Sequence, residues 1–69
     1  MRFMIAIVNG EPRSIEDGRT VADLLAELRL GGRRIAVEIN RDIVPVAYYP
    51  RRSIREGDAI EIVRFVGGG

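Results

Sequence analysis

The most constraining feature of this 69-residue chain is one helix signal with strand-like segments on either side. Thr20 and Asp23 have the spacing of a helix-capping box, in which each side chain accepts a hydrogen bond from the other residue's backbone N–H. Apolar residues then recur on one helix face, at Val21, Leu24, Leu25 and Leu28. Gly31-Gly32 predicts the end of this helix, after about three turns. A lone amphipathic helix must bury its apolar stripe against the other elements, which here are strands.

Two strands are predicted before the helix, joined by a tight hairpin. Residues 3–8 are apolar and rich in β-branched side chains, which favours a strand buried on both faces. Asn9-Gly10 follows, and this dipeptide is typical of a type I′ turn because both residues tolerate a positive φ. A short polar strand over residues 11–15 completes the hairpin.

Three extended segments are predicted after the helix. Within residues 35–40, three β-branched apolar residues alternate with Ala36, Glu38 and Asn40, which indicates a strand with one packed and one partly exposed face. Residues 40–42 are turn-like. Residues 43–45 form a short extended piece that Pro45, lacking an N–H, restricts to a sheet edge or a strand end. An irregular loop over residues 46–58 leads to the last strand, at residues 59–66. The order ββαβββ predicts an α+β domain, with the helix packed on one face of a curved mixed sheet of four to five strands.

Composition excludes several classes of function. The chain has no histidine and no cysteine, and its eleven basic residues are all arginines, so disulfides, zinc sites and thiol or histidine catalysis are excluded. The net charge of +1 argues against nucleic acid as the main partner, because such proteins carry a clustered basic excess. No apolar run is long enough to span a membrane, and the apolar N-terminal segment is too short for a secretory signal. We therefore expect a cytoplasmic protein.

Three glycines, Gly67, Gly68 and Gly69, follow the last predicted strand. Glycines contribute no packing, so one interpretation is a frayed end. The other is functional: a flexible tail without side chains can thread a narrow tunnel in another protein and present its terminal carboxylate to chemistry there. The residues alone leave both interpretations open.

Short motifs in a fixed order cover nearly the whole chain. They are Val-Asn-Gly-Glu at 8–11, Gly-Arg-Thr-Val-Ala-Asp-Leu-Leu at 18–25, Ala-Val-Glu-Ile-Asn at 36–40, Ile-Val-Pro at 43–45, Glu-Gly-Asp at 56–58 and Glu-Ile-Val-Arg-Phe-Val-Gly-Gly-Gly at 61–69. Molybdopterin-synthase small subunits and RNA-associated β-grasp domains share single pieces, whereas Ile-Val-Pro together with a final Val-Gly-Gly-Gly is much more specific. On these motifs the chain resembles the ThiS family, the sulfur carriers of thiamine biosynthesis. The resemblance implies a ubiquitin-like β-grasp domain at 1–66 and a functional tail at 67–69.

The resemblance further implies a carrier rather than an enzyme. A ThiF-like adenylating enzyme of the ubiquitin-activating type would use ATP and Mg²⁺ to convert the Gly69 carboxylate into an acyl-adenylate, with Gly67 and Gly68 threading its active site. A sulfur donor enzyme would then supply the sulfur of a C-terminal thiocarboxylate, and a ThiG-like thiazole synthase would receive that sulfur. The chain itself would bind no cofactor and no metal.

A docking patch for the activating enzyme is predicted on the sheet face away from the helix. If Ile60 and Ile62 face the helix, alternation places Val63 and Phe65 on the opposite face. Ile5 and Ile7 join them there and complete an apolar patch. The alternative is that Phe65 folds over the edge of the core.

Two other functions stay open at this point. One is a sulfur carrier for molybdopterin or for tRNA thiolation, and the other is a non-covalent ubiquitin-like interaction module with an idle tail. Catalysis by the chain itself is disfavoured, because no evident pair of base and nucleophile exists without histidine, cysteine or lysine.

Overall fold

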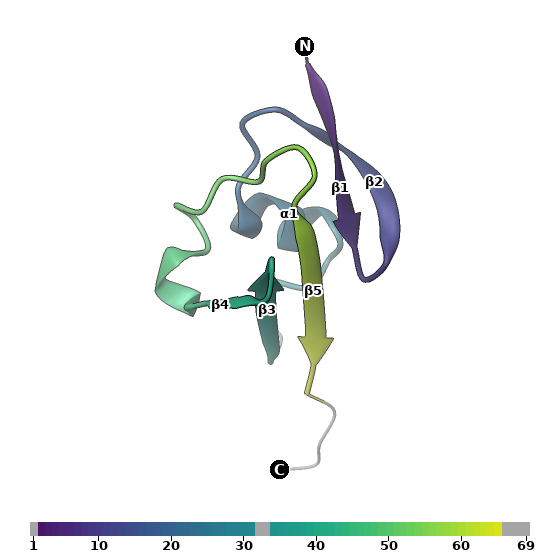
Figure 1. Cartoon of the computed structure of the whole chain (residues 1–69). Helices are drawn as coiled ribbons and strands as arrows, with labels where there is room; N and C mark the ends of the chain where they lie inside the picture. The colour runs from purple at the N-terminus through teal and green to yellow at the C-terminus, as the bar shows by residue number, and fades with distance from the viewer. Residues whose placement is uncertain (1, 32–33, 66–69) are drawn as a thin grey trace.

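The computed structural model describes residues 2–31 and 34–65, and in this part of the chain one α-helix packs on one face of a five-stranded sheet (Figure 1). The elements are β1 (Phe3–Val8), β2 (Glu11–Glu16), α1 (Val21–Glu27), β3 (Ile35–Ile39), β4 (Asp42–Val44), the short 3₁₀ helix η1 (Val46–Tyr48) and β5 (Ala59–Arg64). The sheet order is β2-β1-β5-β3-β4, with β1 and β5 parallel and the other neighbours antiparallel. The predicted ubiquitin-like β-grasp layout is confirmed.

The β1–β2 hairpin closes as predicted, but β1 is buried on one face only. Asn9 and Gly10 have φ values of 50° and 84°, as a type I′ turn requires. Met4 and Ala6 lie in the core, whereas Phe3 and Ile5 are 62% and 43% exposed. The prediction of a strand buried on both faces is wrong, because α1 covers only one side of the sheet.

Helix α1 begins as predicted and ends earlier. The Thr20 N–H donates to Asp23 Oδ2 at 2.9 Å and the Asp23 N–H donates to Thr20 Oγ1 at 3.2 Å, which confirms the capping box. The helix ends at Glu27 because Arg29 adopts a φ of 61°, which lets the Leu30 N–H donate to the Leu25 carbonyl at 2.8 Å. The predicted end at Gly31-Gly32, after about three turns, is therefore wrong: an arginine supplies the left-handed residue expected of glycine.

The capping box makes the stability of the fold depend on pH. The pKa of Asp23 is lowered below its ordinary value of 3.8, mainly by a hydrogen bond with the Thr20 backbone and to a smaller extent by one with the Thr20 side chain. Because folding lowers this pKa, the carboxylate stabilises the fold above pH 3.8 and loses that contribution as the pH falls through its folded pKa. We expect urea titrations to show the stability advantage of the wild type over Asp23→Asn shrinking as the pH drops below 3.8. An advantage independent of pH would contradict this assignment.

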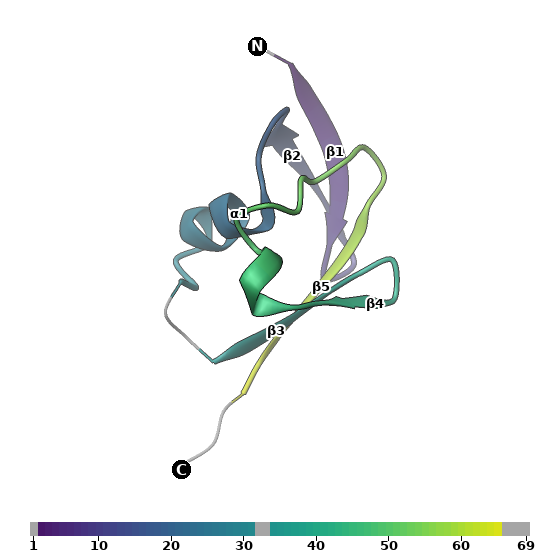
Figure 2. The same ribbon diagram turned by 90° about the vertical axis from the view of Figure 1, so that its left-hand side faces the viewer.

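The core lies between α1 and the inner face of the sheet. Its most buried members include Ala6, Val21, Leu24, Val37 and Ile60. The long segment between β4 and β5, predicted as an irregular loop, contains η1 and lies on the same side of the sheet as α1 (Figure 2). This segment contributes Tyr49 and Ile54 to the core, and β4 is an edge strand as Pro45 predicts. No helix in the described part of the chain is both long and apolar enough to cross a membrane.

Candidate functional site

Strand β5, which precedes the glycine-rich end of the sequence, lies in the middle of the sheet between β1 and β3 (Figure 1). Strand β5 ends at Arg64, but the next residue, Phe65, still donates its backbone N–H to the Arg34 carbonyl at 3.0 Å. Arg34 immediately precedes β3, so the hydrogen bonding between these two chain segments continues one residue past the end of β5. Val66, Gly67, Gly68 and Gly69 lie outside the described residues. The described part of the site is therefore the end of β5 and the sheet face around it.

Two asparagines at hairpin turns hold β5 from both sides. Asn9 donates its backbone N–H to the Ile60 carbonyl at 2.8 Å, and its Oδ1 accepts from the Ile62 N–H at 2.7 Å. Asn40, at the turn between β3 and β4, donates its backbone N–H to the Ala59 carbonyl at 2.8 Å, and its Oδ1 accepts from the Ala59 N–H at 3.0 Å. Both residues have positive φ. The sequence identifies them as turn residues, but their second role depends on contacts with a distant strand.

Replacing Asn9 separates its two roles. In Asn9→Gly the turn residue can still adopt a positive φ without strain, and only the side-chain acceptor is lost. The N–H of the largely buried Ile62 is then left without its hydrogen-bond partner. We expect the free energy of unfolding, measured with urea, to fall by about 1–2 kcal/mol. Arg41→Gly is the matched control, since Arg41 also has positive φ, at 73°, in a hairpin turn. The Arg41→Gly control should be as stable as the wild type or more stable by up to about 1 kcal/mol. Equal effects of the two substitutions would show that the Asn9 side chain does not hold β5.

The turn before β5 is held by a buried carboxylate. Asp58 is 6% exposed and accepts hydrogen bonds from Asn40 Nδ2 at 3.0 Å and from the Arg55 N–H at 2.8 Å. The Arg52 guanidinium lies 3.5 Å from the same carboxylate. These partners compensate the cost of burying the charge, and together they hold the turn that leads into β5.

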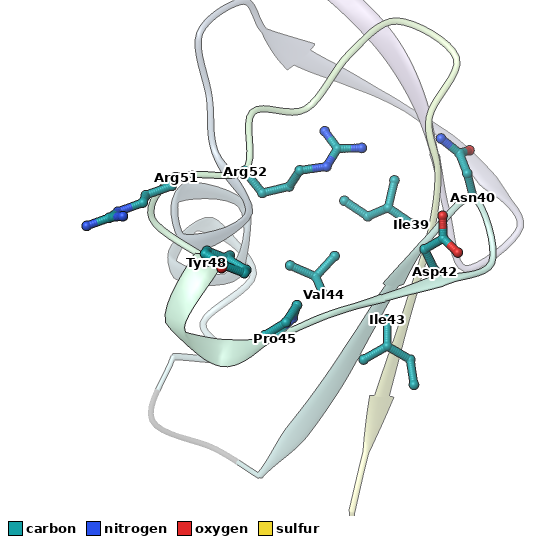
Figure 3. Close-up of a pocket in the computed structure, with 9 residues that line it drawn as sticks. All are labelled: Ile39, Asn40, Asp42, Ile43, Val44, Pro45, Tyr48, Arg51 and Arg52. Carbon is teal, nitrogen blue, oxygen red and sulfur yellow. The ribbon is translucent and has the colours of Figure 1, made fainter.

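An open cavity of about 380 Å³ lies along the β3–β4 hairpin and the first part of the segment between β4 and β5 (Figure 3). It is lined by Ile39, Asn40, Asp42, Ile43, Val44, Pro45, Tyr48, Arg51 and Arg52. Figure 3 shows the Arg51 side chain pointing away from the cavity, while the Arg52 guanidinium is the group paired with Asp58. The predicted site residues that the structure describes, Ile5, Ile7, Val63 and Phe65, do not line this cavity, so we assign it no role in the predicted chemistry.

The four residues of the predicted docking patch, Ile5, Ile7, Val63 and Phe65, alternate along their strands with core residues. They therefore lie on the sheet face away from α1, as predicted. Met4, Ala6, Ile60 and Ile62 are buried against α1, so Ile5, Ile7 and Val63 point to the opposite side of the sheet, here called the outer face. Phe65 continues the alternation of Val63 and is 60% exposed, so it does not fold over the core. Ile5 and Val63 are 43% and 53% exposed, and Ile7 is half-buried.

Strand register separates these residues into two pairs. Ile7 lies beside Ala59, and Val63 is four residues further along β5, which corresponds to roughly 13 Å at the rise of a parallel strand. Glu61 occupies the intervening outward position of β5, directly opposite Glu38 of β3. The predicted patch is therefore two apolar areas with a pair of carboxylates between them. Sequence alternation marks Glu38 and Glu61 as outward-facing, but only the register shows that they are neighbours.

Within residues 2–31 and 34–65, no group of three or more acidic, histidine or cysteine side chains could hold a metal ion. The described structure offers a strand held by hydrogen bonds on both sides and an outer sheet face on which two apolar areas flank a pair of carboxylates. Such an arrangement suits presentation of an adjoining segment to another protein.

Comparison with known proteins agrees with this geometry. The model of the ThiS family matches residues 6–69. The sulfur carrier protein ThiS of Thermus thermophilus is 36% identical over 62 residues, which are 90% of this chain and 95% of that protein. A crystal structure of the thiamine biosynthesis protein ThiS from Geobacter metallireducens superposes with a TM-score of 0.81 at 29% identity, covering 96% of this chain and 100% of the other.

A second kind of relative is longer. A thiazole synthase of Paramagnetospirillum magneticum is 44% identical over 66 residues, which are 96% of this chain. The chain spans only 20% of that protein's length. The ThiS family model, the sulfur carrier relative and the solved ThiS structure each match nearly the whole of this chain, so the chain belongs to the ThiS family.

Proposed function

We propose that this chain is a sulfur carrier for thiamine biosynthesis, and that it acts as a protein substrate rather than as an enzyme. The observation that carries the proposal is the family match over residues 6–69, which includes the three final glycines. The named function of the Thermus thermophilus relative, which the chain matches over 95% of that protein, supports it.

The proposed chemistry takes place at the carboxylate of Gly69. A ThiF-like activating enzyme, using ATP and Mg²⁺, joins this carboxylate to AMP and releases pyrophosphate. A carboxylate is a poor electrophile, and AMP supplies the leaving group that it lacks. Sulfur at the oxidation level of hydrosulfide, delivered by a donor enzyme, displaces AMP as the leaving group, and the product is a C-terminal thiocarboxylate. Because the chain contains no lysine and no cysteine, the activated terminus meets no side-chain amine or thiol of its own.

The described structure is compatible with this use. Strand β5 is paired on both sides and clamped by Asn9 and Asn40, so the chain after Phe65 starts from a fixed position. Gly67 and Gly68 would then thread a partner's active site, where a Cβ would obstruct close approach. The outer face beside the end of β5 would dock the same partner through Val63 and Phe65.

The proposed acceptor of the sulfur is a ThiG-like thiazole synthase. The match of nearly the whole chain to a fifth of a protein named thiazole synthase supports this pairing, since that protein contains a segment similar to the carrier. A requirement for ATP in the proposed activation supports a cytoplasmic location.

The proposal is tested by reconstitution. The full chain is incubated with ATP, Mg²⁺ and the activating enzyme from the same organism, and its intact mass is followed. We expect the mass of an added AMP, and with the sulfur donor enzyme a product in which one oxygen is replaced by sulfur, located on Gly69. Addition of thiazole synthase and its other substrates should consume this thiocarboxylate.

Two outcomes would contradict the proposal and point to the alternatives. A thiocarboxylate that forms but is not consumed by thiazole synthase would indicate another sulfur pathway, such as molybdopterin or tRNA thiolation. Absence of any ATP-dependent mass change, with the folded state confirmed by circular dichroism, would favour a non-covalent interaction module.

A further inference from the structure

Two carboxylates lie directly opposite each other on the outer face. Glu61 of β5 and Glu38 of β3 are register partners in an antiparallel pair, and both alternate with buried residues, so their side chains leave the same face of the sheet. Side chains in such a pair have Cβ atoms about 5 Å apart, and like charges at this separation are destabilising. In the described part of the chain, neither carboxylate is in an ion pair; the acidic residues that are so paired are Glu16 and Asp58.

Apolar side chains lie on several sides of this pair. Ala59 and Val63 flank Glu61 on β5, while Ala36 and Ile43 are the outward neighbours of Glu38 on β3 and β4. Ile43 is 75% exposed and Val63 is 53% exposed. We call these six residues, Ala36, Glu38, Ile43, Ala59, Glu61 and Val63, the acidic strip. It adjoins Phe65 and so lies next to the end of β5.

We propose that the acidic strip is the contact that the activating enzyme recognises, and that it receives an arginine or lysine side chain between Glu38 and Glu61. The inference rests on the proposed carrier function and names the partner's chemistry at the docking face. A single cation placed between the carboxylates replaces a repulsion by two attractions. The apolar residues around it exclude water on docking, which strengthens the charge interaction.

Charge also argues against other occupants. A second copy of this chain, related by two-fold symmetry, would bring the same face and two more carboxylates against the first pair. Nucleic acid and an anionic membrane surface are both negatively charged and would be repelled. A basic protein surface with apolar residues around its cation is the partner that this strip complements.

The test compares Glu38→Gln, Glu61→Gln and the double variant with the wild type. Glu27→Gln is the matched control, since it removes the same charge from an exposed position on α1. Affinity for the purified ThiF-like activating enzyme is measured by calorimetry without ATP, at low and moderate salt. We expect each strip variant to bind at least about tenfold more weakly, with a smaller dependence on salt, and the Glu27 variant to bind as the wild type does.

Two further readouts separate docking from folding. In the free chain, Glu38→Gln and Glu61→Gln remove a repulsion, so their melting temperatures should equal or exceed that of the wild type. In the adenylation assay, their KM for the carrier should rise while kcat is retained, because binding is weakened and the reacting carboxylate is untouched.

The outcomes distinguish this inference from the proposed function. Wild-type adenylation together with unchanged affinity of the strip variants overturns the inference and leaves the carrier function intact. Failure of wild-type adenylation overturns the carrier function, and the calorimetric comparison still reports on the strip because it needs no ATP. A concentration-dependent dimer that the substitutions abolish would overturn the proposed occupant in favour of a second copy.

Discussion

Removal of Gly69 is expected to abolish ATP-dependent adenylation, with a loss of at least about a hundredfold in rate. The deletion moves the terminal carboxylate back by one residue, about 3.5 Å along an extended chain. A misplacement of even about 1 Å at a reacting centre costs about a hundredfold in rate. The measurement is pyrophosphate release by the activating enzyme, together with the intact mass of the carrier.

The fold provides the control for this deletion. The last core residue described is Ile62, so removal of Gly69 should leave the free energy of unfolding unchanged. A Gly68→Val variant tests the tunnel separately, because it keeps the chain length and adds a side chain to the tail. It should also lose adenylation, whereas Glu27→Gln should retain it. Wild-type rates for the deletion would refute Gly69 as the reacting residue.

Leu24→Ala is expected to lower the free energy of unfolding by about 2–5 kcal/mol. Leu24 is 1% exposed, and its side chain belongs to the cluster between α1 and the sheet. Alanine is a better helix former than leucine, so the loss comes from packing alone. Native domains have a total of only about 5–15 kcal/mol, and a domain of this size is expected near the lower end. A large part of the stability of this chain therefore depends on one side chain.

Urea unfolding followed by circular dichroism measures this effect. Glu27→Ala is the control on the same helix, because Glu27 is exposed and its truncation should cost no more than about 0.5 kcal/mol. Equal stabilities of the two variants would contradict the described core. The result matters for function because the same core positions Ile60 and Ile62, and through them the outer face of β5.

Local rules predicted most of the secondary structure. The capping box, the apolar stripe of α1 and the Asn9-Gly10 turn depend on residues a few positions apart, and the structure confirms all three. Two predictions from local patterns were wrong: the burial of β1 on both faces and the end of α1. Glycine is the usual residue for a left-handed helix end, but Arg29 adopts this conformation and the helix stops before Gly31.

Other features of the site depend on pairing between strands that are far apart in the sequence, so the sequence could not show them. Asn9 reaches Ile62 across 53 positions, and this bond exists only because β1 and β5 are neighbours in the sheet. The same parallel register separates Ile7 from Val63, which alternation alone had placed in one patch.

The sequence by itself determined the order of the elements, the family, and the residue proposed to react, Gly69, because these depend on local patterns and on motifs. Only the tertiary structure decided that Glu38 faces Glu61 between two apolar areas, and that β5 is clamped by two turn asparagines. The physical reason is that strand alternation specifies the face of each side chain, whereas its neighbours across the sheet are specified by register. Register is set by how the whole core packs.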